Sequence, residues 1–203
     1  MNKIVADVLA LGEGLAGMTA ALTAAQAGSR VCIAGKGGSA SPFVIGFSAP
    51  VGEDDSPEQF VEDMMTAGCG LNDRELALAF ARRAMDIPQW MEALDAPYEN
   101  TDGKPELMRS LGHTRARLVH QGTKTGPLCM EKLVPLLEES KVQTLHPYAC
   151  MTLLKDGDRV NGAVLMNLET NGLIYVQCSA VVLCTGGCPV SRTTYRRRLF
   201  AGL

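Results

Sequence analysis

The stretch LALGEGLAGMTAALTAAQAG, Leu9–Gly28, runs from a short apolar segment through three glycines into an alanine-rich helix. VADVLAL (5–11), which overlaps the start of this stretch, and SRVCIAG (29–35), which follows it, each predict a buried parallel strand. Gly28 stands where a glycine ends a helix. Strand, glycine turn, helix and strand in this order turn a G-x-G-x-x-G spacing from a weak motif into a strong indication of dinucleotide binding. The alternative is a glycine-rich turn that holds no ligand.

Each glycine of the motif has a predicted role. Gly12 permits the tight turn, Gly14 lets the backbone approach a pyrophosphate, and Gly17 lets helix and strand pack closely. The helix N-terminus offers free N–H groups and a positive dipole to phosphates. The carboxylate that normally ends the second strand and binds the ribose is missing, because Gly35 stands in its place and Glu53–Asp55 lie too far along. We expect that loss to cost about 1.5 to 3 kcal/mol.

Composition restricts the class of protein. The 203 residues are enough for about one domain, and 46% hydrophobic residues, 20% charged residues and a net charge of -3 argue against a general nucleic-acid binder. No apolar run reaches the ~18 residues of a membrane span. The cysteines form no C-x-x-C pair and no zinc spacing, which predicts buried thiols in a reducing cytoplasm and no metal site; they are Cys32, Cys69, Cys129, Cys150, Cys178, Cys184 and Cys188.

The glycine-rich segment 36–60 either covers a cofactor or is a plain surface excursion. Two capped helices follow, the first of which begins within the end of this segment. Ser56 with Pro57 and Gln59 predicts a helix to about residue 67. Asn72 with Asp73 and Glu75 predicts a second helix from residue 73 past Trp90, bent or broken before Pro88. The large apolar residues of both helices are expected in the core.

Residues 98–126 predict a long loop with the densest set of donors in the chain: His113, Arg115, Arg117 and His120. Such donors suit contact with phosphate or carboxylate, and a solvated basic loop is the alternative.

The carboxyl-terminal third changes from helix to strands. Residues 127–140 predict an amphipathic helix, and Asp156-Gly157 and Asn171-Gly172 then mark hairpin turns of a β-meander. An apolar strand, 180–184, ends in Thr185-Gly186-Gly187. A meander inserted after a strand–helix–strand unit is not the pattern of a plain NAD-binding Rossmann domain.

Four segments in this order resemble the amino-terminal part of the FAD-dependent flavoproteins that include fumarate reductase, succinate dehydrogenase and L-aspartate oxidase. They are residues 7–38, 71–99, 112–126 and 180–187. The resemblance implies a glutathione-reductase-like, Rossmann-type α/β fold with FAD as cofactor. It also implies the cofactor-binding residues: Gly12, Gly14, Leu15, Ala16 and Gly17 at the pyrophosphate, Lys36, Ser39, Ala40 and Ser41 after the second strand, Gly46 and Phe47 near the flavin, Cys150 near the adenosine, and Thr185 and Gly186 closing the site.

Three departures limit what the resemblance implies. Gly35 lacks the ribose carboxylate, and no histidine lies between Lys36 and Pro50, so non-covalent FAD is expected. In this family the chain continues past T-G-G into a capping domain that carries the dicarboxylate-binding residues and the proton-donating arginine, so no catalytic residue is carried over. We expect an FAD-binding domain over 1–188 and a basic tail over 189–203, from truncation, a frameshift or an incomplete gene product, or as a native partner-binding tail.

The resemblance therefore predicts the FAD-binding part of an oxidoreductase that moves a hydride between flavin N5 and a dicarboxylate-like substrate. The alternative is a catalytically inert dinucleotide-binding module or remnant subunit that needs a partner chain. A thiol redox protein using Cys184 and Cys188 is a weaker third hypothesis. The expected partners are FAD, a second copy or another chain that completes the fold, and no nucleic acid; the expected compartment is the cytoplasm.

Overall fold

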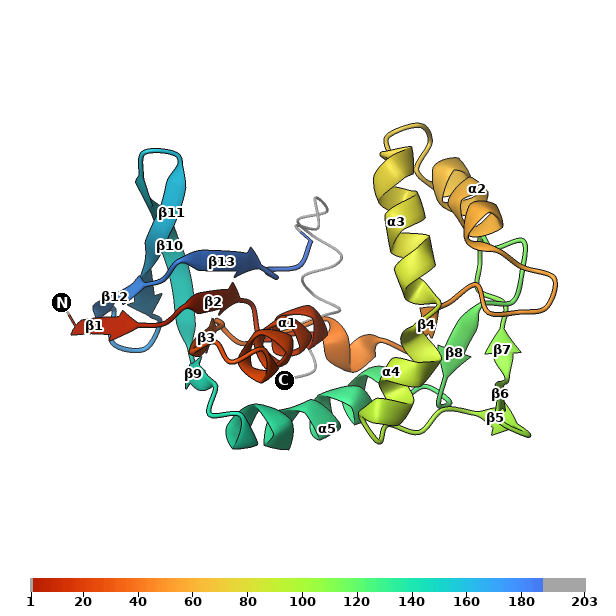
Figure 1. Cartoon of the computed structure of the whole chain (residues 1–203), viewed down its shortest axis with the longest axis horizontal. Coiled ribbons are helices and arrows are strands. Elements are labelled where there is room, and N and C mark those ends of the chain that lie inside the picture. The colour runs from red at the N-terminus through yellow and green to blue at the C-terminus, as the bar shows by residue number, and fades with distance from the viewer. Residues whose placement is uncertain (1, 188–203) are drawn as a thin grey trace. The chain divides into compact units, whose positions relative to one another are not determined.

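The computed structural model describes residues 2–187, which form two compact units (Figure 1). Residues 2–41 and 133–187 make the first unit, and residues 42–132 make the second. The chain therefore leaves the first unit, builds the second and returns.

A parallel sheet carries the glycine motif in the first unit. Its order is β13-β2-β3-β9, and every neighbouring pair is parallel. Helix α1 (Leu15–Gln26) connects β2 to β3. Ala27 is its C-cap, and Gly28 follows with φ +88°, as predicted. The strands are β2 (Val8–Leu11), β3 (Val31–Ala34), β9 (Gln143–Leu145) and β13 (Ala180–Leu183).

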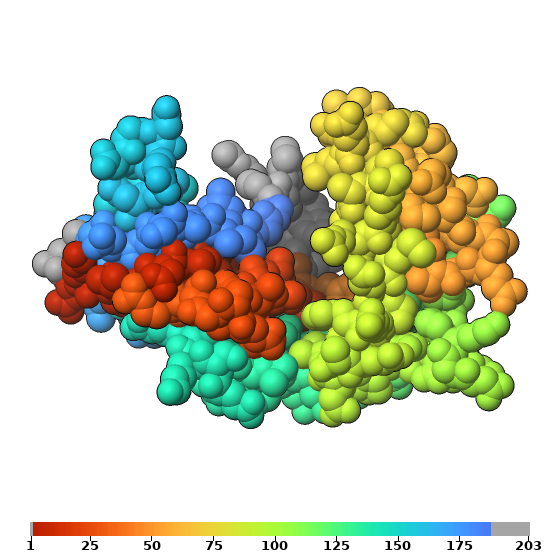
Figure 2. All heavy atoms as spheres, in the orientation of Figure 1, coloured from red at the N-terminus to blue at the C-terminus, as the bar shows by residue number. Residues whose placement is uncertain are grey.

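The predicted meander forms the second sheet of this unit, in the order β1-β12-β11-β10. Pairs β10–β11 and β11–β12 are antiparallel, whereas β1 joins β12 in parallel. Figure 2 shows the tip of the β10–β11 hairpin, near Gly157, as a projection from this unit. The strands are β1 (Asn2–Val5), β10 (Tyr148–Asp156), β11 (Arg159–Asn167) and β12 (Leu173–Gln177).

The buried parallel strand predicted over 5–11 is confirmed only for Val8–Leu11. The chain leaves the meander sheet after Val5 and enters the parallel sheet at Val8. Asp7, between them, accepts hydrogen bonds from the backbone N–H and guanidinium of Arg30, at 2.8 Å and 2.7 Å. Arg30 lowers the pKa of this carboxyl from 3.8 to about 2. A charged side chain in the middle of an apolar run therefore marks the change of sheet.

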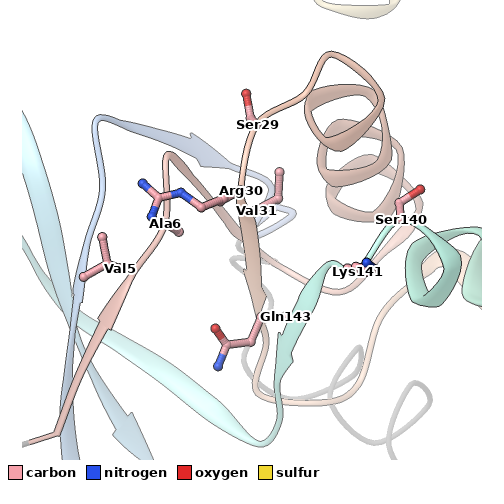
Figure 3. Close-up of a pocket in the computed structure, with 8 residues that line it drawn as sticks. All are labelled: Val5, Ala6, Ser29, Arg30, Val31, Ser140, Lys141 and Gln143. Atoms are coloured by element: carbon pink, nitrogen blue, oxygen red, sulfur yellow. The ribbon is translucent and has the colours of Figure 1, made fainter.

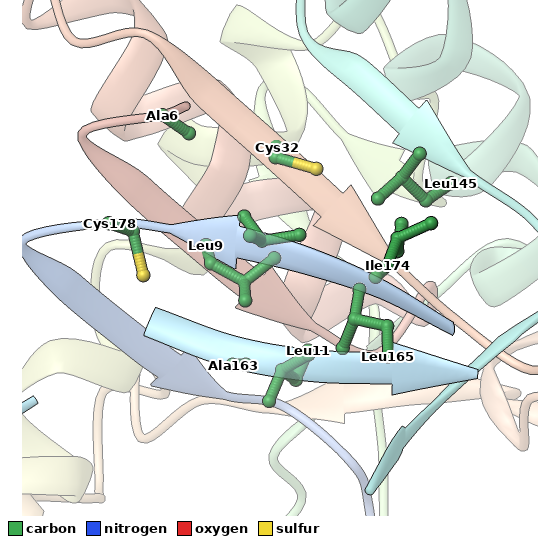
Figure 4. Packing of buried hydrophobic residues seen from close by; sticks show 11 residues of the cluster. Ala6, Leu9, Leu11, Cys32, Leu145, Ala163, Leu165, Ile174 and Cys178 are labelled. Atoms are coloured by element: carbon green, nitrogen blue, oxygen red, sulfur yellow. The ribbon is translucent and has the colours of Figure 1, made fainter. Parts of the chain in front are cut away.

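The core of the first unit lies where the parallel sheet and the meander sheet pack together (Figure 4). Leu9 and Cys32 of the parallel sheet and Leu165 of the meander are fully buried. Burial raises the pKa of the Cys32 thiol to about 12, so this thiol behaves as a small apolar group.

The second unit combines helices with very short strands. Strands β4, β8 and β7 form one sheet, and β5 and β6 form a two-stranded ribbon. Helix α5 begins in this unit and continues into the first. The elements are the 3₁₀ turn Ser41–Phe43, β4 (Gly46–Ser48), α2 (Pro57–Ala67), α3 (Arg74–Ala84), α4 (Ile87–Ala93), β5 (Asn100–Thr101), β6 (Lys104–Pro105), β7 (Leu107–Met108), β8 (Leu118–His120) and α5 (Thr125–Glu139).

The boundaries of α2 and α3 lie where the sequence predicts them, except that a different residue caps the start of α3. The Ser56 hydroxyl accepts the Gln59 N–H at 3.2 Å and α2 ends at Ala67, as expected. The cap of α3 is Asp73, not Asn72, because Asp73 Oδ1 accepts the Leu76 N–H at 2.9 Å. Asn72 instead donates to the Met64 carbonyl at 2.8 Å. The predicted long second helix is broken into α3 and α4 ahead of Pro88.

Helices α2 and α3 bury a smaller core than their apolar residues predict. Phe60, Val61 and Ala81 are buried. Leu76 and Phe80, also on the helices, are 70% and 55% exposed, so the expectation that such residues lie in the core is wrong for them. No helix within the part of the chain described is long and apolar enough to cross a membrane.

The cysteines divide into two groups. Burial is confirmed for Cys32, Cys129 and Cys178, and Cys184 is partly buried. The expectation is wrong for Cys69 and Cys150, which are exposed. Cys188 lies outside the described residues, as does the predicted tail 189–203.

Candidate functional site

Two of the motif glycines are required by close contacts at the end of β2. Gly12 has φ +122°, and a Cβ placed on it would lie 2.1 Å from the carbonyl oxygen of Cys184, just after β13. A Cβ on Gly17 would lie 1.8 Å from the Gly12 carbonyl oxygen. Larger residues therefore cannot replace either glycine unless the turn, α1 or β13 moves.

The start of α1 faces serine hydroxyls. Gly14 caps the helix without a side chain, so the first backbone N–H groups need partners from outside the helix. The Leu15 N–H donates to Ser41 Oγ at 2.9 Å, and the Ser41 N–H donates to Ser39 Oγ at 3.0 Å. A Cβ on Gly14 would lie 2.8 Å and 2.9 Å from the two hydroxyl oxygens. The glycine turn and residues 39–41 thus collect N–H and O–H donors, the groups that bind a phosphate.

The end of β3 has a carboxylate although its own residue is glycine. A Cβ placed on buried Gly35 would lie 2.2 to 2.4 Å from Cγ, Cδ and Oε2 of Glu13. Glu13 Oε2 lies 2.9 Å from Nδ1 of His146, which follows β9. The Glu13 side chain is 19% exposed, whereas that of His146 is 54% exposed. The sequence-based expectation that no carboxylate stands at this strand end is therefore wrong.

Other predicted residues lie close to this turn in the chain or in space. Lys36 and Ala40 are exposed in the segment after β3. The backbone nitrogen of Thr185 would lie 3.2 Å from a Cβ on Gly12, and Gly186 has φ +73°. Cys150 is exposed on β10, two residues after Tyr148, whose N–H donates to the Gly35 carbonyl at 2.7 Å.

Gly46 and Phe47 belong to the second unit, on β4. A Cβ on Gly46 would lie 2.6 Å from Leu118 Cγ, so β4 and β8 pack closely there. The Phe47 ring packs edge-on against Trp90, with ring centroids 5.8 Å apart.

Two arginines of the donor cluster, Arg115 and Arg117, pair with carboxylates of the second unit. Arg117 is fully buried and donates to both oxygens of Asp55, at 2.6 Å and 2.9 Å, and also to Asp63. Burial raises the pKa of Asp63, but hydrogen bonds from Thr114 and Arg117 outweigh it and hold the pKa below its usual value. Arg115 pairs with Asp54 at 3.3 Å. Arg117 therefore contacts carboxylate, one of the two predicted partners, but the carboxylates are those of Asp55 and Asp63 of the chain itself. The alternative of a solvated basic loop is wrong for Arg117.

A cavity of about 290 Å³ lies at the opposite ends of the parallel strands (Figure 3). Its lining includes Ala6 before β2, Arg30 before β3 and Gln143 at the start of β9. Ligands of parallel α/β sheets bind outside the carboxyl ends of the strands, where the glycine turn lies. This cavity is therefore not the dinucleotide site.

Sequence reasoning missed Glu13 and His146. Glu13 occupies the variable position of G-x-G, between two glycines with assigned roles. His146 follows Gln143–Leu145, a strand that the sequence pattern does not single out and that pairs with β3 in the parallel sheet. The signal that was available is an acidic residue inside the motif of a chain whose strand-end position is glycine.

Comparison with known proteins identifies the group to which this arrangement belongs. Residues 7–201 match the family described as FAD binding domain. L-aspartate oxidase of Streptomyces coelicolor is 33% identical over 194 residues, which cover 91% of this chain and 33% of that protein. The chain therefore spans about a third of the length of that curated relative.

Solved structures agree in fold. The Sdh1 complex of Mycobacterium smegmatis matches with a TM-score of 0.83 and 29% identity over 92% of this chain and 35% of that chain. FrdA of E. coli quinol fumarate reductase matches with a TM-score of 0.83 and 25% identity over 92% of this chain and 33% of that chain. The predicted resemblance and the predicted parallel α/β fold are thereby confirmed, and the donor-lined glycine turn fits a dinucleotide. The chain belongs to the FAD binding domain family, and its cofactor is FAD.

Proposed function

We propose that this chain is the FAD-binding part of a flavin-dependent oxidoreductase acting on a dicarboxylate-like substrate. Bound FAD would supply the redox chemistry, by hydride transfer at flavin N5. The similarity to L-aspartate oxidase and to a fumarate reductase structure supports this class of reaction. By the family resemblance, the substrate-binding and proton-transferring groups would lie in parts of the relatives that the chain does not match, so no catalytic residue is proposed.

The glycine turn would hold the pyrophosphate. In this proposal the backbone at Gly12 and Gly14 approaches the phosphates, and the first N–H groups of α1, at Leu15, Ala16 and Gly17, donate to them. The Ser41 hydroxyl, which accepts the Leu15 N–H, would exchange that bond for one with a phosphate oxygen. The observation that carries the proposal is this set of donors in front of a turn that only glycines fit.

The remaining cofactor-binding residues are proposed from their positions. Lys36, Ser39, Ala40 and Ser41 follow β3, at the carboxyl end of a parallel strand. Thr185 and Gly186 follow β13, the neighbour of β2 in the same sheet. The family resemblance adds the Cys150 backbone at the adenosine, and Gly46 and Phe47 at the flavin, held without a covalent bond.

The domain and its surroundings form part of the same proposal. Residues 1–188 would be the FAD-binding domain and 189–203 a basic tail. The chain would act in the cytoplasm, with a second copy or another polypeptide completing the active centre. The alternative function is a catalytically inert FAD-binding module or remnant subunit that needs a partner chain.

The test is to incubate the purified full chain with FAD, remove free ligand on a desalting column and record the absorbance spectrum, with NAD as a parallel ligand. Flavin absorbance that elutes with the protein supports the proposal, and a colourless protein contradicts it. Addition of a polypeptide with the remaining two thirds of a relative would separate the two functions. Dicarboxylate-dependent flavin oxidation or reduction in the mixture supports the oxidoreductase, and unchanged flavin supports the inert module.

A further inference from the structure

Gly35 is held firmly in the place where a dinucleotide-binding strand ends. Its N–H donates to the Leu145 carbonyl at 3.1 Å, and its carbonyl accepts the Tyr148 N–H at 2.7 Å. These bonds connect the end of β3 to both sides of the segment that contains His146. The backbone therefore has the position from which a carboxylate normally reaches the ribose hydroxyls, but no side chain with which to do so.

The Glu13 side chain fills that position. Three of its atoms lie within 2.4 Å of the point where a Gly35 Cβ would stand, which is closer than two non-bonded side chains can approach. A side chain at residue 35 and Glu13 in this conformation therefore cannot share the place, and glycine at residue 35 leaves it open to Glu13. The chain thus carries a carboxylate at the strand end, supplied from the glycine turn instead of from the strand.

His146 holds this carboxylate on one side. Its Nδ1 lies 2.9 Å from Oε2 of Glu13. Within residues 2–187, no group hydrogen-bonds the other carboxylate oxygen, Oε1. The ring also lies near the following turn, since a Cβ on Gly37 would be 3.2 Å from His146 Cε1. One carboxylate oxygen is positioned by the histidine, and the other is available to a ligand hydroxyl.

We propose that Glu13 is the ribose-binding carboxylate of this chain, with His146 as its positioning residue. The inference rests on the proposed function, because it assigns the adenosine ribose of FAD to the same site. A carboxylate that accepts hydrogen bonds from the ribose hydroxyls stabilises the bound dinucleotide, as the strand-end acid does in other dinucleotide sites. The departure at Gly35 is then a relocation of the acid and not its loss.

The experiment compares dissociation constants for FAD, by flavin fluorescence and titration calorimetry, in the full-length wild type and four variants. Glu13→Ala and Glu13→Gln should weaken binding about ten- to a hundred-fold. Glu13→Ala with Gly35→Glu should recover most of the affinity, because removal of Glu13 frees the space for a strand-end side chain. Gly35→Glu alone should not improve binding, since the two carboxylates would compete for one place.

A second ligand pair isolates the ribose. ADP should bind the wild type more tightly than 2′,3′-dideoxy-ADP, and this preference should disappear in Glu13→Ala and return in the double variant. His146→Ala should reduce the preference for ADP over 2′,3′-dideoxy-ADP in the wild type but not in Glu13→Ala. If the histidine only stabilised the fold, its removal would not depend on Glu13 in this way. Far-UV circular dichroism of each variant checks that it is folded.

Each outcome separates the inference from the function on which it rests. A wild type that binds no FAD overturns the proposed function, and the inference with it. A wild type that binds FAD, with Glu13→Gln binding equally well or more tightly, overturns the inference alone, because the carboxylate then contributes nothing or repels the pyrophosphate. Rescue by the double variant, together with the lost preference for ADP, supports the relocation.

Discussion

The two units use their polar groups in opposite ways. In the first unit the N–H groups at the start of α1 face serine hydroxyls, and Glu13 lies at the end of a strand with one oxygen that no residue of 2–187 hydrogen-bonds. In the second unit Arg117 is enclosed by Asp55 and Asp63 of the same unit, with no exposed guanidinium surface. Polar groups that saturate one another stabilise a fold, whereas half-buried groups with spare capacity can bind a ligand. The comparison favours the glycine turn over the denser cluster of charges as the candidate site.

The largest effect is expected from Arg117→Met. It leaves two carboxylates without their cation in a buried place and should destabilise the second unit by about 3 to 5 kcal/mol. Trp90 is the only tryptophan of the chain and lies in this unit, so its fluorescence during denaturant unfolding measures the change. The control is Arg115→Met, whose ion pair with Asp54 is exposed and should contribute at most about 1 kcal/mol. Equal shifts for the two variants would contradict a structural role for the buried network.

A smaller loss is expected from Gly17→Ala in the first unit. Alanine at a helical position is ordinarily more stable than glycine by about 1 kcal/mol, but here the methyl group would lie 1.8 Å from the Gly12 carbonyl oxygen. We expect a destabilisation of about 1 to 3 kcal/mol, measured by thermal unfolding followed by circular dichroism. The matched control is Gly187→Ala, where a Cβ meets nothing within 4 Å and should leave stability unchanged. A stabilised Gly17→Ala variant would show that the turn is not packed against α1.

Thiol labelling compares the two units in one experiment. Each unit offers an exposed and a buried cysteine for comparison: Cys150 and Cys32 in the first, Cys69 and Cys129 in the second. Burial raises the pKa of Cys32 to about 12 and that of Cys129 to about 11, so neither should react with iodoacetamide in the native protein, whereas Cys69 and Cys150 should. Mass spectrometry of peptides gives the rates. FAD should slow the labelling of Cys32 under mild denaturant more than that of Cys129, and equal protection would contradict a pyrophosphate site at the glycine turn of the first unit.

The smallest effect concerns the exposed pair of Asp7 and Arg30. The pKa of Asp7 falls from 3.8 to about 2 in the folded chain, so the pair contributes stability above about pH 4 and loses it as pH falls toward 2. Asp7→Asn should therefore be less stable than the wild type near neutral pH, and this difference should vanish at pH 2. Unfolding curves at several pH values give the difference. A gap that persists at pH 2 would show that Asp7 acts through packing or its neutral hydrogen bonds.

Local signals predicted the elements that lie next to each other in the chain. The strand, turn, helix and strand around Gly12, the cap at Ser56 and the hairpin at Asp156-Gly157 each depend on residues a few positions apart, and each is confirmed. The exchange of cap from Asn72 to Asp73 is an error of one residue between two good capping types.

The errors concern partners that are far apart in the chain. Arg117 meets Asp55 and Asp63 across more than fifty residues, and Glu13 meets His146 across more than a hundred. Nothing in the local pattern around Arg117 distinguishes a buried cation from a solvated one, because burial is decided by the tertiary fold. The missing acid at Gly35 was predicted from a spacing rule, which cannot register a side chain that arrives from another segment.

The return of the chain to the first unit has a consequence for folding kinetics. Strand β9 pairs with β3 in register Cys32 with Gln143, although the whole second unit lies between them. Closing so long a loop through an unfolded chain costs conformational entropy that grows with the logarithm of its length. If residues 42–132 fold first, less unfolded chain separates β3 from β9. The pairing of these two strands should then be faster. We therefore expect the inserted unit to accelerate assembly of the sheet that carries the glycine turn.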